Sequence, residues 1–270
     1  MKSAFEKLEK LKELLKELEP VTVAFSGGVD STFLLRVAAD TLGKKVCAIT
    51  VESPYIAKWE IEEADELSQI MGVDHIHLAF EIPESIRNNP EDRCFLCKTA
   101  VFSAIVEETI KRGFKTVVDG SNADDLLDYR PGMKALKNLG IESPLLNVGM
   151  TKDEIRFLSK EMGLPTWDKP PYACLLTRIP YNTLVDEDSL RMIEGAEKFI
   201  MDMGIKGIRV RKHGTIARIE VSKEEMPKML DLEIMDKISK TLKNIGFEFV
   251  TMDLSGYKMG SFNTGLTQES

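Results

Sequence analysis

The 270-residue sequence has no apolar run long enough to cross a bilayer, no excess of basic residues, and only three histidines and four cysteines. A bilayer-spanning helix needs about 20 consecutive apolar residues. The net charge of −8 argues against a large non-specific nucleic-acid surface, because such binding relies on Lys and Arg to neutralise phosphates. The charged amphipathic start of the chain lacks the apolar segment of a signal peptide. We therefore expect a cytoplasmic protein with neither a membrane nor a nucleic-acid partner.

The few cysteines include one close pair, Cys94 and Cys97 in "RCFLCK". In a reducing compartment such a pair indicates a metal site or catalysis more often than a disulfide. The residues alone fit a redox couple, half a zinc site, part of an iron–sulfur site or chance packing. No histidine shows ligand spacing to a cysteine, and a redox couple leaves Cys174 unexplained. Cys47, inside the apolar run "KVCAITV", is interpreted as a core residue.

Short β-branched runs alternate with helical periodicity through the first two thirds of the chain. Strands are predicted at residues 21–25, 45–51, 74–80 and 115–122, and helices at residues 5–18, 30–43, 58–72, 97–113 and 151–165. Thr151 and Glu154 have the spacing of a capping box at the start of the last helix. This alternation predicts an α/β fold with a doubly wound parallel sheet.

From about residue 183 the pattern changes. A helix is predicted at residues 186–204, two strands at 207–214 and 215–222, a second helix at about 224–245 and a last strand at 247–254. This αββαβ order predicts a smaller α+β domain with an antiparallel sheet. The prolines of residues 168–183 mark the junction, because proline interrupts regular structure. The predicted domains are therefore residues 1–180 and 181–270.

The most specific motif is "SGGVDS", residues 26–31, which follows directly on a predicted strand and opens a helix. Two glycines allow a tight turn and bring backbone N–H groups close to a ligand. The helix N-terminus attracts negative charge, and the serines add hydroxyl donors. The motif is neither a Walker A loop nor a Rossmann fingerprint. The residues predicted to bind phosphate are Ser26, Gly27, Gly28, Asp30 and Ser31.

This loop resembles the pyrophosphate loop (PP-loop) of the ATP-pyrophosphatase superfamily, which has an adenine nucleotide alpha hydrolase-like fold. The superfamily includes GMP synthetase, NAD synthetase, asparagine synthetase and the tRNA thiolases. The resemblance implies that ATP is cleaved between its α- and β-phosphates, so that a substrate oxygen is adenylated and a nitrogen or sulfur nucleophile displaces AMP. Mg²⁺ would spread the charge of the leaving pyrophosphate.

Further stretches from about residue 5 to 265 resemble the LarE family. They are "DGSNADDLLDYRPG", "SPLL", "TKDEIR", "DKPPYACLLTRIPY", "IRVRKHGTIARIEV" and "GYKMGSFN". LarE proteins are ATP-dependent sulfur transferases of nickel-pincer cofactor synthesis. The resemblance implies pyridinium-3,5-biscarboxylic acid mononucleotide as the substrate, whose carboxylates are adenylated and converted to thiocarboxylates. It also suggests a homo-oligomer, a trimer or a hexamer.

The same resemblance assigns roles to the cysteines. Cys174 falls where LarE proteins carry their sulfur-donating cysteine, which in single-cysteine members gives up its own sulfur and becomes dehydroalanine. With Cys94 and Cys97 added, the sequence looks like the three-cysteine members that hold a [4Fe–4S] cluster and leave one iron open for hydrosulfide from a sulfide source. Sacrificial donation from Cys174 and three unrelated cysteines stay open as alternatives.

Several charged residues are further candidates. Arg209 and Arg211 alternate on a predicted strand and so face one side; by resemblance they would bind the substrate phosphate, whereas the plainer interpretation is a solvated basic edge. A second group follows the strand at 115–122, where such folds place their sites. It comprises Asn122, Asp124, Asp125 and Arg130, which could bind nucleotide, magnesium or substrate or could form a solvated turn.

Lys98 and Arg178 flank cysteines and could balance thiolate or phosphate charge, although surface solvation explains them equally well. We expect Asp30 and Lys98 to be catalytic together with Cys174. His75 and His77 alternate on the third predicted strand and are interpreted as structural. A tRNA thiolase is the nearest rival function, and a non-catalytic nucleotide-binding or iron–sulfur sensor is the rival from another class.

Overall fold

The computed structural model describes residues 2–127 and 131–257, which pack into two compact units. The first unit comprises Met1–Ser85 and Asp92–Tyr172. The second comprises Ala173–Ser270 together with the short segment Ile86–Glu91. The second unit therefore takes in a loop from the middle of the first unit's sequence. Among the described residues, no helix combines the length and the apolar character needed to span a membrane.

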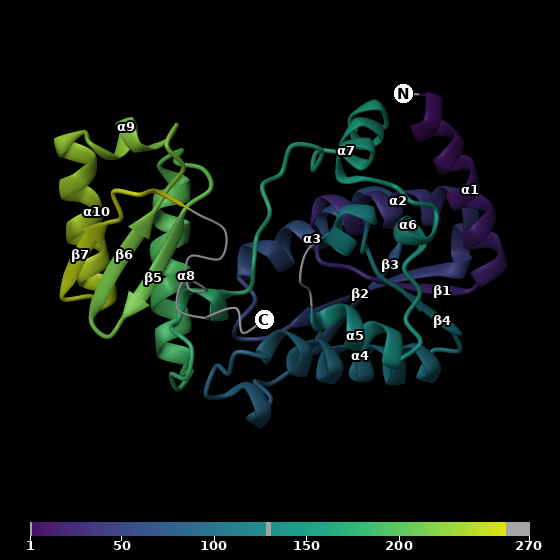
Figure 1. Cartoon of the computed structure of the whole chain (residues 1–270), viewed down its shortest axis with the longest axis horizontal. Coiled ribbons are helices and arrows are strands. Elements are labelled where there is room, and N and C mark those ends of the chain that lie inside the picture. Colours follow the sequence, from purple (N-terminus) through teal and green to yellow (C-terminus); the bar gives the residue numbers. More distant parts are fainter. Residues whose placement is uncertain (1, 128–130, 258–270) are drawn as a thin grey trace. The chain divides into compact units, whose positions relative to one another are not determined.

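The first unit is built on a four-stranded parallel sheet of order β3-β2-β1-β4 (Figure 1). The strands are β1 (Val21–Ala24), β2 (Val46–Glu52), β3 (Asp74–Ala79) and β4 (Thr116–Val118). Their apolar, β-branched residues are buried in β1 and β2, as expected for central strands covered on both faces. The predicted doubly wound parallel sheet is confirmed.

Helices cover both faces of this sheet. They are α1 (Lys2–Leu18), α2 (Val29–Leu42), α3 (Lys58–Met71), α4 (Arg93–Lys111), α5 (Pro131–Asn138), α6 (Pro144–Asn147) and α7 (Lys152–Glu161), with short 3-10 turns η1 (Gly43–Lys45), η2 (Glu84–Ile86) and η3 (Ala123–Leu127). One core joins β1 to α1, α2 and α7, and the other joins β2 and β4 to α4 and α5. Figure 1 shows these two groups of helices on opposite sides of the sheet. The predicted capping box is present, with Thr151 and Glu154 bonded reciprocally.

The strand order creates a switch point. The chain moves outward from β1 to β2 and β3, and then returns to the other side of β1 to form β4. In open parallel sheets, ligands bind beyond the carboxyl ends of the strands at such a point. The loops that follow β1 and β4, residues 25–28 and 119–122, are placed there by this connectivity.

The second unit is a three-stranded sheet of order β5-β6-β7 with helices packed on it. Its elements are η4 (Leu175–Arg178), α8 (Glu187–Asp202), β5 (Arg209–His213), β6 (Ile216–Glu220), α9 (Met226–Met229), α10 (Leu232–Ile245) and β7 (Phe249–Met252). The predicted antiparallel sheet is wrong in one pair, because β7 runs parallel to β6. The helices between β6 and β7 carry the chain back to the same end of the sheet, so the crossover pairs these strands in parallel.

Two predicted helices have different bounds in the structure. The helix expected at 97–113 begins at Arg93, so that Cys94 and Cys97 both lie inside it. The helix expected at 224–245 is two helices, because Asp231 accepts hydrogen bonds from the Glu233 and Ile234 N–H groups and caps a new helix there.

Candidate active site

The phosphate loop lies where the sequence predicts it, between β1 and α2. The Ser26 and Ser31 hydroxyl oxygens are 3.1 Å apart, and the Ser26 N–H donates to the Ser31 hydroxyl at 3.3 Å. Gly27 has a φ of +65°, which an L side chain rarely adopts. A Cβ atom on Gly28 would stand 3.3 Å from the Ser26 hydroxyl. The loop thus presents backbone and hydroxyl donors at the start of a 14-residue helix, which is an arrangement suited to phosphate.

Asp30 occupies the first turn of α2 and forms an ion pair with Lys152 of α7. Burial raises the pKa of the Asp30 carboxyl more than Lys152 lowers it, and the charge of nearby Asp125 raises it further, while Asn122 acts to lower it. The Asp30 Oδ1 atom is buried and accepts no hydrogen bond from any described residue. A buried carboxylate oxygen without a donor is costly, and a bound cation would satisfy it.

The loop after β4 lies against the phosphate loop through Gly120. A Cβ atom on Gly120 would stand 3.0 Å from the Ser31 nitrogen and 3.3 Å from the Asp30 carbonyl carbon. Only a glycine therefore lets the two loops approach so closely at this point. The buried Asp119 side chain fixes the same loop by accepting hydrogen bonds from Ser121 at 2.5 Å and Ser143 at 2.6 Å.

The predicted residues of this second loop are largely bonded to one another. The Asn122 side chain accepts from the Asp124 N–H, and Asp125 accepts from the Asn122 N–H, each at 3.0 Å. Asp124 also accepts the Lys152 N–H at 2.8 Å. Any role of these side chains toward nucleotide, magnesium or substrate stays a prediction. Arg130, predicted for the same loop, lies outside the described residues.

Two lysines that the sequence did not single out bring positive charge to the phosphate loop. Lys152 reaches Asp30 with its side chain and Asp124 with its backbone, and so joins the two loops. Lys169 donates to the Gly27 carbonyl at 3.0 Å and is also paired with Glu63. Neither lysine belongs to a recognisable local motif, so only the fold reveals them.

The cysteine pair lies at the start of α4. Cys94 and Cys97 are three residues apart on one face of the helix; Cys94 is exposed and Cys97 half-buried. The Tyr55 hydroxyl lies 3.3 Å from the Cys97 Sγ. Burial raises the pKa of the Cys97 thiol, the neighbouring Cys94 adds to this rise, and Tyr55 and Lys98 act against it. Both thiols are free and directed to the same side.

Lys98 follows this pair and is half-buried. Its stem lies so close to Gly132 that a Cβ atom there would be 2.6 Å from the Lys98 Cδ. Its ammonium nitrogen is 6.0 Å from the centre of the Phe102 ring. Its catalytic assignment stays a prediction. Cys47, by contrast, is buried in β2 with its Sγ 3.3 Å from the Thr22 hydroxyl, which confirms its interpretation as a core residue.

Cys174 lies in the second unit, at the start of η4, and its loop is held by Arg178. This arginine is 1% exposed and forms a bidentate pair with Glu197, with both N–O distances 2.9 Å. It also donates to the Ala173 carbonyl at 2.6 Å and to the Cys174 carbonyl at 3.2 Å. Arg178 is therefore not a solvated surface residue but the group that fixes the backbone on both sides of the Cys174 nitrogen.

Arg209 and Arg211 are buried, which contradicts the interpretation as a solvated basic edge. Arg211 pairs with Glu220 at 2.8 and 2.9 Å and donates to the Thr177 carbonyl. The Arg209 guanidinium lies 5.1 Å from the centre of the Tyr257 ring and donates to the Ile208 carbonyl. Arg211 is thus largely committed to a carboxylate, and the substrate-binding role of both arginines stays a prediction.

Comparison with known proteins supports this description of the site. Residues 9–159, which contain the phosphate loop, match the asparagine synthase family. The pyridinium-3,5-bisthiocarboxylic acid mononucleotide synthase of Lactiplantibacillus plantarum is 35% identical over 94% of this chain and 92% of its own length. An uncharacterized protein of a Synechocystis strain is 37% identical over 97% of this chain and 98% of its own length.

More distant similarity is confined to part of the chain. A glutamine-hydrolyzing GMP synthase of Pyrococcus furiosus contains a polypeptide that is 28% identical over 59% of this chain and 55% of its own length. The similarity to the mononucleotide synthase extends through both units, and the loop geometry is that of an ATP-using PP-loop enzyme. The chain therefore belongs to the LarE family of PP-loop ATP pyrophosphatases.

Proposed function

We propose that the protein is an ATP-dependent sulfur transferase that converts pyridinium-3,5-biscarboxylic acid mononucleotide into its bisthiocarboxylic acid. The observation that carries this proposal is the 35% identity, over nearly the whole of both chains, to a synthase named for that product. A phosphate loop that continues into a helix, beside a buried and unsatisfied Asp30 oxygen, supports the ATP-dependent step.

The first half-reaction would be an adenylation. A substrate carboxylate oxygen attacks the α-phosphorus of ATP, the bond to the β-phosphate oxygen breaks, and pyrophosphate leaves. The N–H and hydroxyl groups of Ser26, Gly27, Gly28 and Ser31 would hold the leaving pyrophosphate. The charges of Lys152 and Lys169 would favour its binding. Asp30 would hold Mg²⁺, which supplies neutralisation of the phosphate charge when bound.

The second half-reaction would replace oxygen by sulfur. A hydrosulfide-level sulfur attacks the acyl carbon, the acyl–phosphate bond breaks, and AMP leaves with the thiocarboxylate as the product. One proton is released from each hydrosulfide. Two such cycles would convert both carboxylates of the substrate.

We assign Cys94, Cys97 and Cys174 to a [4Fe–4S] cluster. Two thiols on one face of the first turn of α4 provide adjacent thiolate ligands of the kind that such clusters require. When bound, the cluster would supply one iron open to hydrosulfide. Asn89 supports the assignment: within the second unit its amide donates to the Leu176 carbonyl at 3.3 Å and the Ile179 carbonyl at 2.8 Å, and Cys94 follows five residues later in the chain.

The test is a count of turnovers by the anaerobically reconstituted protein with ATP, the pyridinium substrate and added sulfide. AMP, pyrophosphate and thiocarboxylate should form repeatedly, at many sulfurs per chain. One sulfur per chain, with Cys174 lighter by the mass of hydrogen sulfide, would indicate sacrificial donation instead. No AMP release with any pyridinium carboxylate would overturn the proposal in favour of a sensor.

A separate measurement addresses the tRNA thiolase alternative. Binding to tRNA depends on counterion release and weakens steeply with salt, so strong, salt-sensitive retention on tRNA would favour that function. With a net charge of −8 we expect no retention. The remaining assignments are a cytoplasmic location, an external sulfide source and a homo-oligomer, a trimer or a hexamer, which light scattering would resolve.

A further inference from the structure

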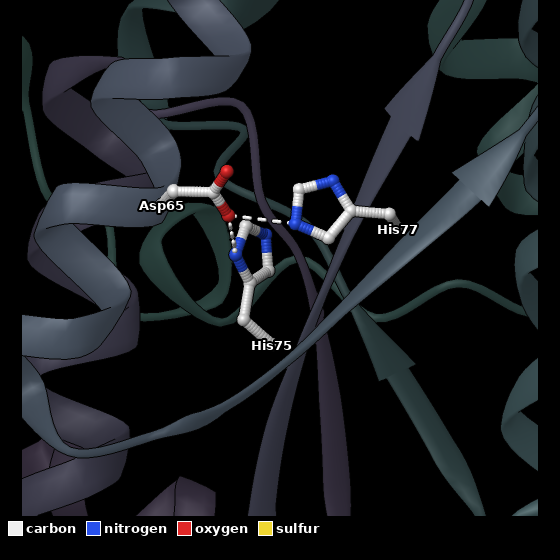
Figure 2. A group of neighbouring side chains, drawn as sticks. All are labelled: Asp65, His75 and His77. Carbon is white, nitrogen blue, oxygen red and sulfur yellow. Dashed lines mark hydrogen bonds and ion pairs between the residues drawn. The ribbon is translucent and has the colours of Figure 1, made fainter.

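One polar cluster lies outside the residues used above, on the edge strand β3 and the helix α3. Figure 2 shows Asp65 of α3 directed at both His75 and His77 of β3. The Asp65 Oδ1 atom is 2.8 Å from the His75 Nδ1 and 2.6 Å from the His77 Nε2. The two rings are 4.6 Å apart between centroids. Two imidazole nitrogens therefore converge on a single carboxylate oxygen.

The outer nitrogen of His75 must carry a proton. His75 Nε2 lies 2.7 Å from the Thr50 hydroxyl, and that hydroxyl donates its proton to the Phe25 carbonyl at 2.7 Å. A threonine hydroxyl has one proton, so His75 is the donor in this contact. The inner Nδ1 then meets only acceptors, because the Ser68 hydroxyl, 3.1 Å away, donates to the Asp65 carbonyl.

His77 has the same arrangement on the other side. Its outer nitrogen, Nδ1, is bonded to the Glu52 carboxylate, and its inner nitrogen faces Asp65. A histidine that binds a metal through one nitrogen commonly donates its other N–H to a carboxylate or another acceptor, which fixes the ring. Thr50 and Glu52 are such acceptors. The supporting contacts of a metal site are therefore in place around both rings.

We propose that Asp65, His75 and His77 form a binding site for one divalent first-row transition metal ion, with Zn²⁺ as its representative. Two imidazoles and one carboxylate are ligands that suit Zn²⁺ and its neighbours. Their three donor atoms all lie within 4.8 Å of one another. Charge also balances, because one divalent cation replaces the two ring protons that the inner nitrogens would otherwise need beside the carboxylates of Asp65 and Glu52.

The site can open to admit the ion. Metal–ligand distances of about 2.0–2.2 Å place neighbouring donors about 3.3 Å apart in a tetrahedron, so the present contacts would widen by about half an ångström. The Asp65 and His77 side chains are 37% and 34% exposed, whereas His75 is 7% exposed. Two of the three ligands thus face solvent, and a fourth position is left for water or another ligand.

The ion would act on the edge of the sheet nearest the phosphate loop. Thr50 links His75 to the Phe25 carbonyl, one residue before Ser26. On α3, the backbone of Ala64 is 3.4 Å from where a Gly27 Cβ would stand, and Asp65 is the next residue. Metal binding would clamp α3 to β3 directly behind the loop, which gives the site a structural role that does not depend on the proposed reaction.

The decisive measurement is a calorimetric Zn²⁺ titration of the chelator-treated protein. The competing thiols are first removed in a parent variant carrying Cys94→Ser, Cys97→Ser and Cys174→Ser. We expect one ion per chain, and an affinity at least about tenfold weaker after His77→Asn, which removes the inner nitrogen yet keeps an N–H for Glu52. Asp65→Asn should weaken binding similarly, and His213→Asn should not change it.

A second readout uses the unmodified protein and so does not depend on the folding of any variant. Diethyl pyrocarbonate modifies accessible histidine nitrogens, and Zn²⁺ should protect His77 from it while His213 serves as the internal reference. No Zn²⁺ binding in the parent, equal affinity with and without His77→Asn, or unchanged modification of His77 would each overturn the proposal. The cluster would then be a hydrogen-bonded network only.

Discussion

Lys152, at the first position of α7, forms an ion pair with Asp30 in the first turn of α2, and only one oxygen of that carboxylate is used. The pair joins two helices whose first turns both face the end of the parallel sheet where the phosphate loop lies. Burial raises the pKa of Asp30 despite this pair. The second oxygen, Oδ1, is the one available to a cation.

This arrangement predicts that Asp30→Asn lowers the rate of AMP formation by about 100-fold or more, because Mg²⁺ loses its ligand and Lys152 its partner. Asp40→Asn, in the last turn of the same helix, is the matched control, since Asp40 pairs only with the exposed Arg36. AMP release at saturating ATP and over a range of Mg²⁺ concentrations measures both effects. Equal rates for the two variants would contradict the assignment of Asp30.

Gly120 provides a test of the contact between the two loops. We expect Gly120→Ala to reduce AMP formation by about 10- to 100-fold, because its Cβ would press on the Ser31 nitrogen and displace the phosphate loop. Gly195→Ala in α8 is the control, since the nearest atom to its Cβ is the Ile245 Cδ1 at 3.7 Å. Wild-type activity of Gly120→Ala would show that the loop tolerates the shift.

The cluster assignment predicts different outcomes for different cysteines. Cys94→Ser or Cys97→Ser should leave fewer than about two irons per chain after anaerobic reconstitution. Cys47→Ala should retain the wild-type iron content, because Cys47 is buried in β2 beside Thr22. Iron and sulfide analyses with visible absorbance measure both. Iron content that is indifferent to all three changes would exclude these ligands.

The buried pair of Arg178 and Glu197 should matter more to stability than any exposed pair. Removing one partner leaves a buried charge unpaired, so Arg178→Met should lower the free energy of unfolding by about 3–5 kcal/mol. Arg191→Met breaks an exposed pair with Asp188 and should cost less than about 1 kcal/mol. Urea unfolding measures the difference, and similar losses in the two variants would refute this account of the Cys174 loop.

Glu154 gives a prediction on pH. Burial acts to raise its pKa, but hydrogen bonds from Lys7 and Thr151 outweigh burial, and the pKa is lowered from its ordinary value of 4.5. A carboxyl with a lowered folded-state pKa stabilises the fold above its unfolded pKa, and this contribution is lost as pH falls through the folded-state pKa. Glu154→Gln should therefore cost about 1 kcal/mol at neutral pH, and the difference should vanish below about pH 4. A constant difference across that range would contradict the sign.

Local patterns predicted much of this protein because their physical causes are local. The alternation of apolar runs determined the parallel sheet, and the glycines and serines of residues 26–31 determined the phosphate loop. The capping box at Thr151 needs only residues three apart. The antiparallel prediction for β7 failed because strand direction depends on the path of the crossover, which periodicity does not report.

The sequence by itself determined the α/β class, the phosphate loop between β1 and α2, and the set of candidate cysteines. Only the tertiary structure decided which distant side chains meet: Lys152 with Asp30, Arg178 with Glu197, and Asp65 with His75 and His77. Periodicity shows which face of an element is buried. Ion pairs and ligand sets depend instead on how separate elements pack, and that is fixed by contacts between residues far apart in the chain.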